Sequence, residues 1–429
     1  MDSPNTQVAN SLPESPTNYW INLFCLIFFF GAMFLLHASF PRMGNVELTT
    51  ICLLIVAVPL WLRDFIKERV YKRPSTGLLT QPGKINKERL VIKLIGLHGT
   101  LLIILFLYYL NPTYRISPRT AVFYNSFFYF LNLLAPWIVI LSFVYFWIVD
   151  RRQKDPYDEY WHMGCLLTGR WKEVNPVVLK EHAKVWFIKA FFTPFMFAIL
   201  VTSVGILLAY NWKGGFLSLF DYSLTLFYAI DVIYGVLGYI LTFRLLDTHI
   251  RSTDPTLLGW VVCLACYSPF ANFGINLFNY DDGINWNHWF AFPPGFYYFY
   301  GITIIFLSLV YCLATVAFGY RMSNLTFRGI ITSGPYRFTK HPAYLCKVAS
   351  WWLISLPFLS VEGPWTALKY TFSLSMITFI YYLRARTEEY HLSKYPEYVA
   401  YANWIKEHGM FSSIRRHFPA LNKITLRRT

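Results

Sequence analysis

The sequence of 429 residues contains few charged residues, because Asp, Glu, Lys and Arg together make up only 14% of it. Hydrophobic residues account for 55% and aromatic residues for 20% of the chain. A soluble domain carries about a quarter of its residues as charged side chains. The composition therefore excludes a soluble protein and indicates an integral membrane protein that crosses the bilayer several times.

Cysteine is also scarce and is not arranged in pairs across the sequence. The seven cysteines are scattered, mostly within apolar segments. Cys263 and Cys266 have the spacing of a CxxC motif, but no second pair accompanies them, and at helical spacing they are typical of packing. We therefore predict neither a disulfide framework nor a metal site.

Three further absences restrict the organisation of the chain. No Gly-x-Gly-x-x-Gly motif follows a predicted strand, which excludes a Rossmann domain. No internal repeat or Gly/Ser-rich linker divides the sequence, so we expect one membrane domain. The first 18 residues lack the basic segment of a cleaved signal peptide, so the first apolar run is expected to remain as an anchor.

Apolar segments of membrane-spanning length occur about ten times. Because backbone groups in lipid must form hydrogen bonds within their own segment, these segments are predicted to be helices. The fold class is therefore all-α, a polytopic integral membrane protein. The predicted spans are 19–38, 47–62, 91–110, 121–149, 185–210, 222–246, 256–277, 294–319, 343–361 and 366–383.

Basic residues are concentrated in alternate connections. The connections on one side hold nearly all loop Lys and Arg, whereas those on the other hold only Arg42, Arg115, Arg119 and Lys213. The positive-inside rule therefore predicts that both termini are cytoplasmic, in a bacterial inner membrane or the endoplasmic reticulum. Since the net charge of +15 is spread over these loops, nucleic-acid binding is not expected.

The densest polar clusters flank the last two apolar segments. The first, Gly334 to Tyr344, reads Gly-Pro-Tyr-Arg-Phe-Thr-Lys-His-Pro-Ala-Tyr. The second contains Arg384, Arg386, Glu388 and Glu389 and is followed by Pro396, Tyr398 and Tyr401. Ionisable groups beside hydrocarbon usually mark a functional site. Basic residues that only anchor a helix to lipid headgroups are the simpler explanation of each residue alone.

These two clusters resemble the C-terminal signature of the isoprenylcysteine carboxyl methyltransferase and phospholipid methyltransferase superfamily. The first cluster fits Gly-Pro-Tyr-Arg-x-x-Arg-His-Pro-x-Tyr with Lys340 in place of the second arginine. The second fits Arg-x-x-x-Glu-Glu-x-x-Leu followed by Pro-x-Tyr-x-x-Tyr. Cys346 stands where many members have a small glycine. The resemblance covers roughly the last hundred residues.

The resemblance implies a membrane enzyme that uses S-adenosylmethionine to methylate a lipid or lipid-linked acceptor. Catalytic residues would be Arg384, Arg386, Glu388 and Glu389. Residues that bind the cofactor would be Tyr336, Arg337, Lys340, His341, Pro342, Tyr344, Glu388, Glu389 and Tyr398. On this basis residues 293–429 form the methyltransferase-like core with a basic tail. Residues 1–18 are a cytoplasmic polar tail, and 19–292 form a substrate tunnel with an amphipathic cytoplasmic loop at 150–184.

Charged residues before this core are candidates for contact with the acceptor. Asp231 lies well inside a predicted span, Arg244 lies near its inner end, and Arg321 begins a polar cluster that ends at Gly329. For Asp231 and Arg244, a role in binding the substrate and a role in holding helices together by charge are both open. The cluster that contains Arg321 could cap the preceding helix and turn the chain, or it could join the site.

Two other functions remain open from the sequence. The sterol reductases share the basic His-Pro-x-Tyr element and use NADPH, and the spacing of Asp221 and Asp231 resembles an aspartate pair in those enzymes. A transporter or a non-catalytic lipid-binding membrane protein is the third hypothesis. The expected partner is a membrane lipid or lipidated substrate, and the sequence makes no prediction of oligomeric state.

Overall fold

The computed structural model describes residues 11–111, 114, 118–273 and 279–417 of the chain, and within them nearly every regular element is a helix. The exceptions are two short strands, β1 (Ser252–Thr253) and β2 (Thr326–Phe327), which pair antiparallel. The prediction of an all-α polytopic membrane protein is confirmed. The predicted tail residues 1–10 and 418–429, and Arg115, lie outside the described residues.

Seven helices in the described part of the chain are long and apolar enough to cross a membrane. Each overlaps one of the predicted spans, although α6 begins nine residues before its predicted start at 185 and α7 covers Gly215–Ile240 instead of the predicted 222–246. They are α1 (Tyr19–Ser39), α2 (Asn45–Leu62), α3 (Lys87–Leu110), α4 (Pro118–Val149), α6 (Pro176–Leu208), α7 (Gly215–Ile240) and α12 (Pro294–Phe318).

The remaining three predicted spans differ from the helices observed. In place of one helix over 256–277, α8 (Leu257–Leu264) ends after eight residues and α9 (Phe270–Phe273) follows; residues 274–278 are not described. An eight-residue helix is about 12 Å long, too short for the ~30 Å hydrocarbon core. The prediction of one continuous helix is wrong, because a turn over residues 265–269 that contains Pro269 separates α8 from α9, and proline interrupts a helix.

The last two predicted spans form a helical hairpin of unequal arms. The first arm, α13 (Pro342–Ser355), has only 14 residues and ends at Leu356, whose backbone is left-handed with φ of 44°. The second arm, α14 (Pro364–Leu392), has 29 residues and continues past the predicted end at 383 into the polar cluster. The long arm thus carries the second cluster towards the start of the short arm.

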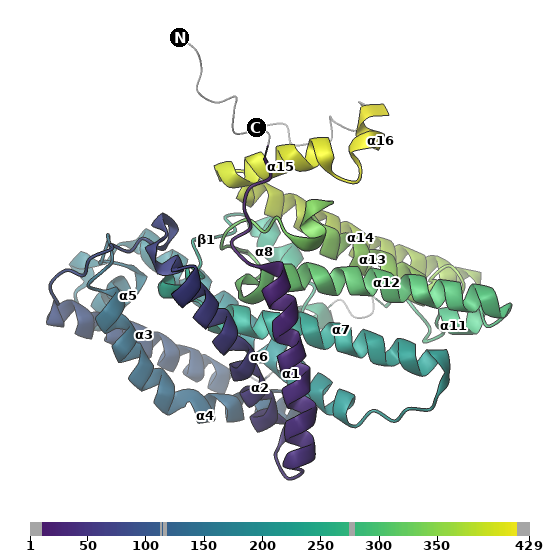
Figure 1. Ribbon diagram of the computed structural model, residues 1–429, viewed down its shortest axis with the longest axis horizontal. Coiled ribbons are helices and arrows are strands. Elements are labelled where there is room, and N and C mark those ends of the chain that lie inside the picture. The colour runs from purple at the N-terminus through teal and green to yellow at the C-terminus, as the bar shows by residue number, and fades with distance from the viewer. Residues whose placement is uncertain (1–10, 112–113, 115–117, 274–278, 418–429) are drawn as a thin grey trace.

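The helices form two connected groups (Figure 1). At the C-terminal side, α12, α13 and α14 run next to one another, and α15 (Pro396–His408) lies across the end of α14. Helix α7 packs against both α12 and α6, with a fully buried face that includes Ala229, Ile233 and Val236. It therefore joins the front helices to the C-terminal hairpin.

The loop predicted at 150–184 contains the short helix α5 (Glu159–Leu167), which packs closely against α3. Gly96 on α3 and Gly164 on α5 allow this approach, because a Cβ atom on Gly164 would overlap the carbonyl oxygen of Ile92. Lys93 on α3, which is fully buried, is satisfied by Asp150, Asp158 and Gln153. The loop is thus fixed to the helix bundle by packing and by buried charge pairs. The other short helices are α11 (Trp286–Trp289) and α16 (Ser412–His417).

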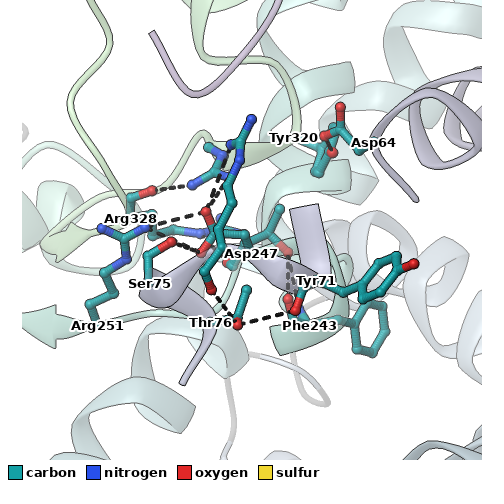
Figure 2. Close-up of polar contacts among 12 residues, drawn as sticks. Asp64, Tyr71, Ser75, Thr76, Phe243, Asp247, Arg251, Tyr320 and Arg328 are labelled. Carbon is teal, nitrogen blue, oxygen red and sulfur yellow. Dashed lines mark hydrogen bonds and ion pairs between the residues drawn. The ribbon is translucent and has the colours of Figure 1, made fainter. Parts of the chain in front are cut away.

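A buried carboxylate connects segments that are far apart in the sequence (Figure 2). Asp247, which is 1% exposed, pairs with Arg251 and Arg321 at 3.2 Å each and with Arg73 at 3.9 Å. Its Oδ1 also accepts a hydrogen bond of 2.9 Å from Ser75. One negative charge therefore holds the loop after α2, the segment before β1 and the end of α12 together.

Arg328 completes this cluster by binding backbone carbonyl groups. Its Nε donates to the carbonyl of Thr248 at 2.6 Å, and one terminal nitrogen donates to the carbonyl of Gly238 at 2.7 Å. Carbonyl groups at the end of a helix lack partners within the helix, so the guanidinium caps α7. Burial, together with the charge of Arg321, lowers the pKa of Arg328 to about 9.

Replacing Asp247 with Asn should destabilise the protein strongly, because the buried Arg321 would lose its only described carboxylate partner. Removing one member of a buried ion pair costs about 3–5 kcal/mol. Thermal unfolding in detergent measures the effect, and Asp221→Asn on the exposed surface of α7 is the matched control. An Asp247→Asn variant that melts with the wild type would show that this cluster does not hold the segments together.

Candidate active site

The two sequence clusters meet in space at the start of α13 and the end of α14. Nε2 of His341 lies 3.1 Å from Oε1 of Glu389, and Lys340 forms a salt bridge with the same carboxylate oxygen. Arg386 lies 3.8 Å from the other oxygen of Glu389. Residues that are 48 positions apart in the sequence thus form one network.

The charge state of Glu389 follows from these partners. Burial raises the pKa of Glu389, but the hydrogen bond with His341 and the positive charge of Lys340 outweigh it and lower that pKa to about 2. The side chain of Glu389 is only 9% exposed, so solvent screens its salt bridge with Lys340 only weakly. Glu389 is therefore ionised at neutral pH and holds the basic end of the first cluster in place.

Helix α15 closes over the first cluster through its tyrosines. The hydroxyl of Tyr401 donates to the backbone carbonyl of Tyr336 at 2.8 Å, within the 3₁₀ turn Gly334–Arg337 that precedes α13. Tyr398 is buried in the same apolar cluster as Tyr336 and Tyr401. The Pro-x-Tyr-x-x-Tyr motif therefore shapes the site by packing, and neither Tyr398 nor Tyr401 lines the cavity described next.

A cavity of about 550 Å³ lies between this network and helices α6, α7 and α12. Six of the residues predicted from the motif line it: Tyr336, Lys340, His341, Tyr344, Arg384 and Glu388. The other predicted members, Arg337, Pro342, Arg386, Glu389 and Tyr398, lie outside its lining. The volume is in the range typical of sites for small ligands.

Arg384 is the most unusual residue in the cavity wall. It is 6% exposed, and within the described residues its guanidinium pairs with no carboxylate. The charge instead lies 5.1–5.7 Å from the ring centroids of Tyr267, Tyr344 and Tyr381. Cation–π contacts of this kind stabilise a desolvated cation. The site thus keeps a buried positive charge available to an anionic group.

Asn324 fixes the orientation of Arg384 and was not predicted as a site residue. Its Oδ1 accepts a hydrogen bond of 3.1 Å from the guanidinium, and its Nδ2 donates to the hydroxyl of Tyr239 on α7 at 3.1 Å. One signal in the sequence pointed to Asn324, because it lies in the polar cluster from Arg321 to Gly329. Nothing in the sequence distinguished it from its neighbours there.

Among the front residues proposed for the substrate, Asp231 lines the cavity. Its carboxylate accepts hydrogen bonds from the hydroxyls of Tyr311 and Thr315, both on α12. Lys347 on α13 also lines the cavity, and its Nζ lies 3.4 Å from the hydroxyl of Tyr311. Sequence reasoning missed Tyr311 and Thr315, because a single tyrosine or threonine in an apolar span carries no distinctive pattern.

The structure places the other two substrate candidates elsewhere. Arg321 belongs to the Asp247 cluster, and Arg244 donates to the carbonyl of Thr76 at 3.3 Å. Neither lines the cavity. Asp221, the other half of the aspartate pair noted in the sequence, is exposed and also lies outside the cavity lining.

The network around Glu389 predicts a specific dependence of stability on pH. Because its pKa falls from 4.5 to about 2 on folding, the carboxylate stabilises the folded state above pH 4.5 and loses this contribution as the pH falls towards 2. The contribution is on the order of 3 kcal/mol. Glu389→Gln should therefore melt well below the wild type at pH 7, and the gap should narrow between pH 4.5 and 2. A gap that is independent of pH would contradict the assignment of this charge.

Comparison with protein families gives one match, to the isoprenylcysteine carboxyl methyltransferase (ICMT) family, over residues 299–401. No curated protein and no solved structure matches the chain. The matched region begins within α12 and ends in α15, so it includes both sequence clusters but neither α6 nor α7. The chain is therefore similar to the isoprenylcysteine carboxyl methyltransferase family over residues 299–401, about a quarter of its length.

Proposed function

We propose that this chain is an integral membrane methyltransferase that uses S-adenosylmethionine and acts on a lipid or isoprenoid-linked acceptor at the cytoplasmic face. The family match and the seven long apolar helices support a membrane methyltransferase. The observation that carries the finer proposal is the cavity that joins the family's two polar clusters to helices α6 and α7.

The residues around the cavity fit the groups of S-adenosylmethionine. Its carboxylate would be held by the buried guanidinium of Arg384 or the ammonium of Lys347, neither of which forms a salt bridge within the described residues. Glu388, whose side chain is 38% exposed, would hold the ammonium. The rings of Tyr344 and Tyr381 would face the positive sulfonium. When bound, the cofactor supplies an electrophilic methyl group.

The chain's own contribution to such a reaction is position and the exclusion of water. His341 and Lys340 are held by Glu389, and Arg384 is held by Asn324, so the polar side chains at this end of the cavity cannot rotate freely. The buried network places them on rigid helices. A methyl acceptor that entered the same cavity would be aligned with the donor without any movement of the backbone.

The opposite wall of the cavity is suited to an apolar tail. It is lined by Phe195, Ile199 and Ile206 from α6 and by Tyr228 from α7. Ile206 is 49% exposed and Tyr228 is 37% exposed, so this wall reaches the surface of two membrane-spanning helices. A lipid acceptor would enter here from the side, between α6 and α7.

The distribution of basic residues supports a cytoplasmic active site, with both termini on that side. A bacterial inner membrane or the endoplasmic reticulum fits this arrangement. Modification of engineered single cysteines in intact membranes by an impermeant thiol reagent measures the topology. A cysteine at Glu397 on α15 should react only in opened vesicles, and labelling from the outside of intact cells would overturn this orientation.

Binding of the cofactor product gives a direct test of the proposed enzyme class. Calorimetry of the purified full chain should detect S-adenosylhomocysteine and should detect neither NADP⁺ nor NADPH. Heat with the dinucleotide alone would favour the reductase hypothesis, although Asp221 lies outside the cavity. Heat with neither ligand would favour a non-catalytic lipid-binding protein or a transporter.

Variants of the Glu389 network should lose turnover while the protein stays in the membrane. His341→Ala and Glu389→Gln remove the contacts that position the cavity wall, and we expect a loss of at least about 100-fold in kcat/KM, since small misplacement at a site can cost this much. Initial rates of methyl transfer by each purified variant, at varied lipid concentration, measure kcat/KM, and a mass increase of one CH₂ identifies the lipid product.

The matched controls for these variants are His408→Ala and Glu397→Gln, which change exposed residues of α15. Both controls should retain wild-type methylation. Full activity in either network variant would remove that residue from the site.

A further inference from the structure

The charged cluster formed by Asp231, Tyr311, Thr315 and Lys347 lies in the cavity wall but includes no residue of the two family clusters. Three helices contribute to it: α7 carries Asp231, α12 carries Tyr311 and Thr315, and α13 carries Lys347. All four residues line the cavity. Asp231 itself lies outside the region that matches the family, which begins at residue 299.

The carboxylate of Asp231 lies inside a membrane-spanning helix, where an ionisable group destabilises the folded protein unless it is compensated. Asp231 lies nine residues before the end of α7 at Ile240, which corresponds to about 14 Å along the helix. Ionisable residues at such depth in a membrane protein are costly and usually serve a function. Joining α7 to α12 does not require a carboxylate, since an amide or hydroxyl would accept the same hydrogen bonds from Tyr311 and Thr315 at lower cost.

The carboxylate of Asp231 has hydrogen-bond acceptor positions that remain free for a ligand. An ionised carboxylate has about four acceptor positions, and the hydroxyls of Tyr311 and Thr315 occupy two of them. The Lys347 ammonium lies 3.4 Å from the Tyr311 hydroxyl and 4.9 Å from the centroid of its ring, and within the described residues it forms no salt bridge with Asp231. Asp231 is therefore fixed in orientation while part of it faces the cavity.

We infer that Asp231 accepts the proton of the methyl acceptor, and that the reacting group of the acceptor is a hydroxyl or an amine on a lipid. This inference rests on the proposed methyltransferase function. The oxygen or nitrogen of the acceptor forms a bond to the methyl carbon, the carbon–sulfur bond of the sulfonium donor breaks, and its electron pair stays on sulfur. The proton released from the O–H or N–H group passes to the Asp231 carboxylate.

A carboxylate acceptor fits this cavity less well. Such an acceptor is already anionic at neutral pH and has no proton to lose, so it needs no base. At the free acceptor positions of Asp231 it would also be repelled, because like charges are unfavourable at short distance in a site of low dielectric constant; the cations of the cavity, Arg384 and Lys347, would attract it away from Asp231. A hydroxyl or amine instead donates a hydrogen bond to the free acceptor positions of Asp231 and is aligned by it.

Other titratable groups surround Asp231 and bear on any measurement that varies pH. Those that interact electrostatically with Asp231 are Tyr311 and Cys312 on α12, Tyr381 on α14 and Tyr336 in the 3₁₀ turn before α13. Tyr228 on α7 and Lys347 on α13 contact Tyr311. Of these, only Lys347 carries a positive charge, and Asp231 is the only carboxylate in the group.

The nature of the methylated product tests the acceptor class. The purified full chain is incubated with S-adenosylmethionine labelled on the methyl group and with vesicles of total polar lipid, and the product is then treated with mild alkali. We expect the label to remain non-volatile, as in an O-methyl ether or an N-methyl group. Release of the label as methanol would reveal a methyl ester and would overturn the inference.

The role of Asp231 is tested by its substitution. Asp231→Asn should lower kcat by about 10²- to 10⁴-fold, as expected for loss of a general base, with little change in KM for the donor. The residual rate should rise with pH, because hydroxide then removes the proton. Asp231→Ala should recover part of its activity when formate is added, which a purely structural role would not allow. Asp221→Asn, on the exposed surface of the same helix, is the control and should behave as the wild type.

Each outcome of this test leads to a different conclusion. Wild-type activity in Asp231→Asn, or a loss of activity with neither dependence on pH nor rescue by formate, would overturn the inference and leave the proposed function intact. Calorimetry with S-adenosylhomocysteine shows whether each variant still folds around the donor site. If the wild type binds S-adenosylhomocysteine but methylates no lipid, the proposed function fails, and the inference fails with it.

Discussion

The contact between Glu389 and the pair Lys340–His341 is the interaction on which the site depends. It joins the beginning of α13 to the end of α14, so it closes the polar end of the helical hairpin. Two side chains of the cavity wall, Lys340 and His341, contact this carboxylate directly, and Glu388 is its neighbour in the chain. Without it, the two clusters would be separate basic and acidic surfaces, each of which a lipid headgroup would satisfy.

Two further buried networks support this hairpin from the front half of the chain. Asp247 forms salt bridges with arginines from three segments, and Arg328 caps the end of α7. These contacts fix the position of α7 relative to α12 at the polar end. Asn324 then connects Tyr239 on α7 to Arg384 on α14. The orientation of a residue in the family motif is thus set by a helix outside the family-matched region. The same helix supplies Asp231 to the cavity.

Sequence reasoning predicted the parts of the structure that are encoded locally. The long apolar helices and the convergence of the two polar clusters follow from hydropathy and from a two-part motif, and seven of the ten spans are observed as long apolar helices. The span at 256–277 failed because a turn over residues 265–269 interrupts the helix, which the mean hydropathy of the segment does not reveal. Tertiary packing decides which charged residues line the cavity. Asp231 faces the cavity, whereas Arg244 binds the backbone carbonyl of Thr76 and Arg321 pairs with Asp247. Their spacing in the sequence carried no information about this difference.

The cavity has walls of two different origins, and this division has a consequence for how such a protein diversifies. Residues of the polar end belong to the family-matched region, whereas Phe195, Ile199 and Tyr228 come from helices outside residues 299–401. Substitutions on α6 and α7 can therefore alter the length and shape of the molecule accommodated without disturbing the network around Glu389. The shape of this wall and the position of the polar network are thus encoded by separate parts of the chain.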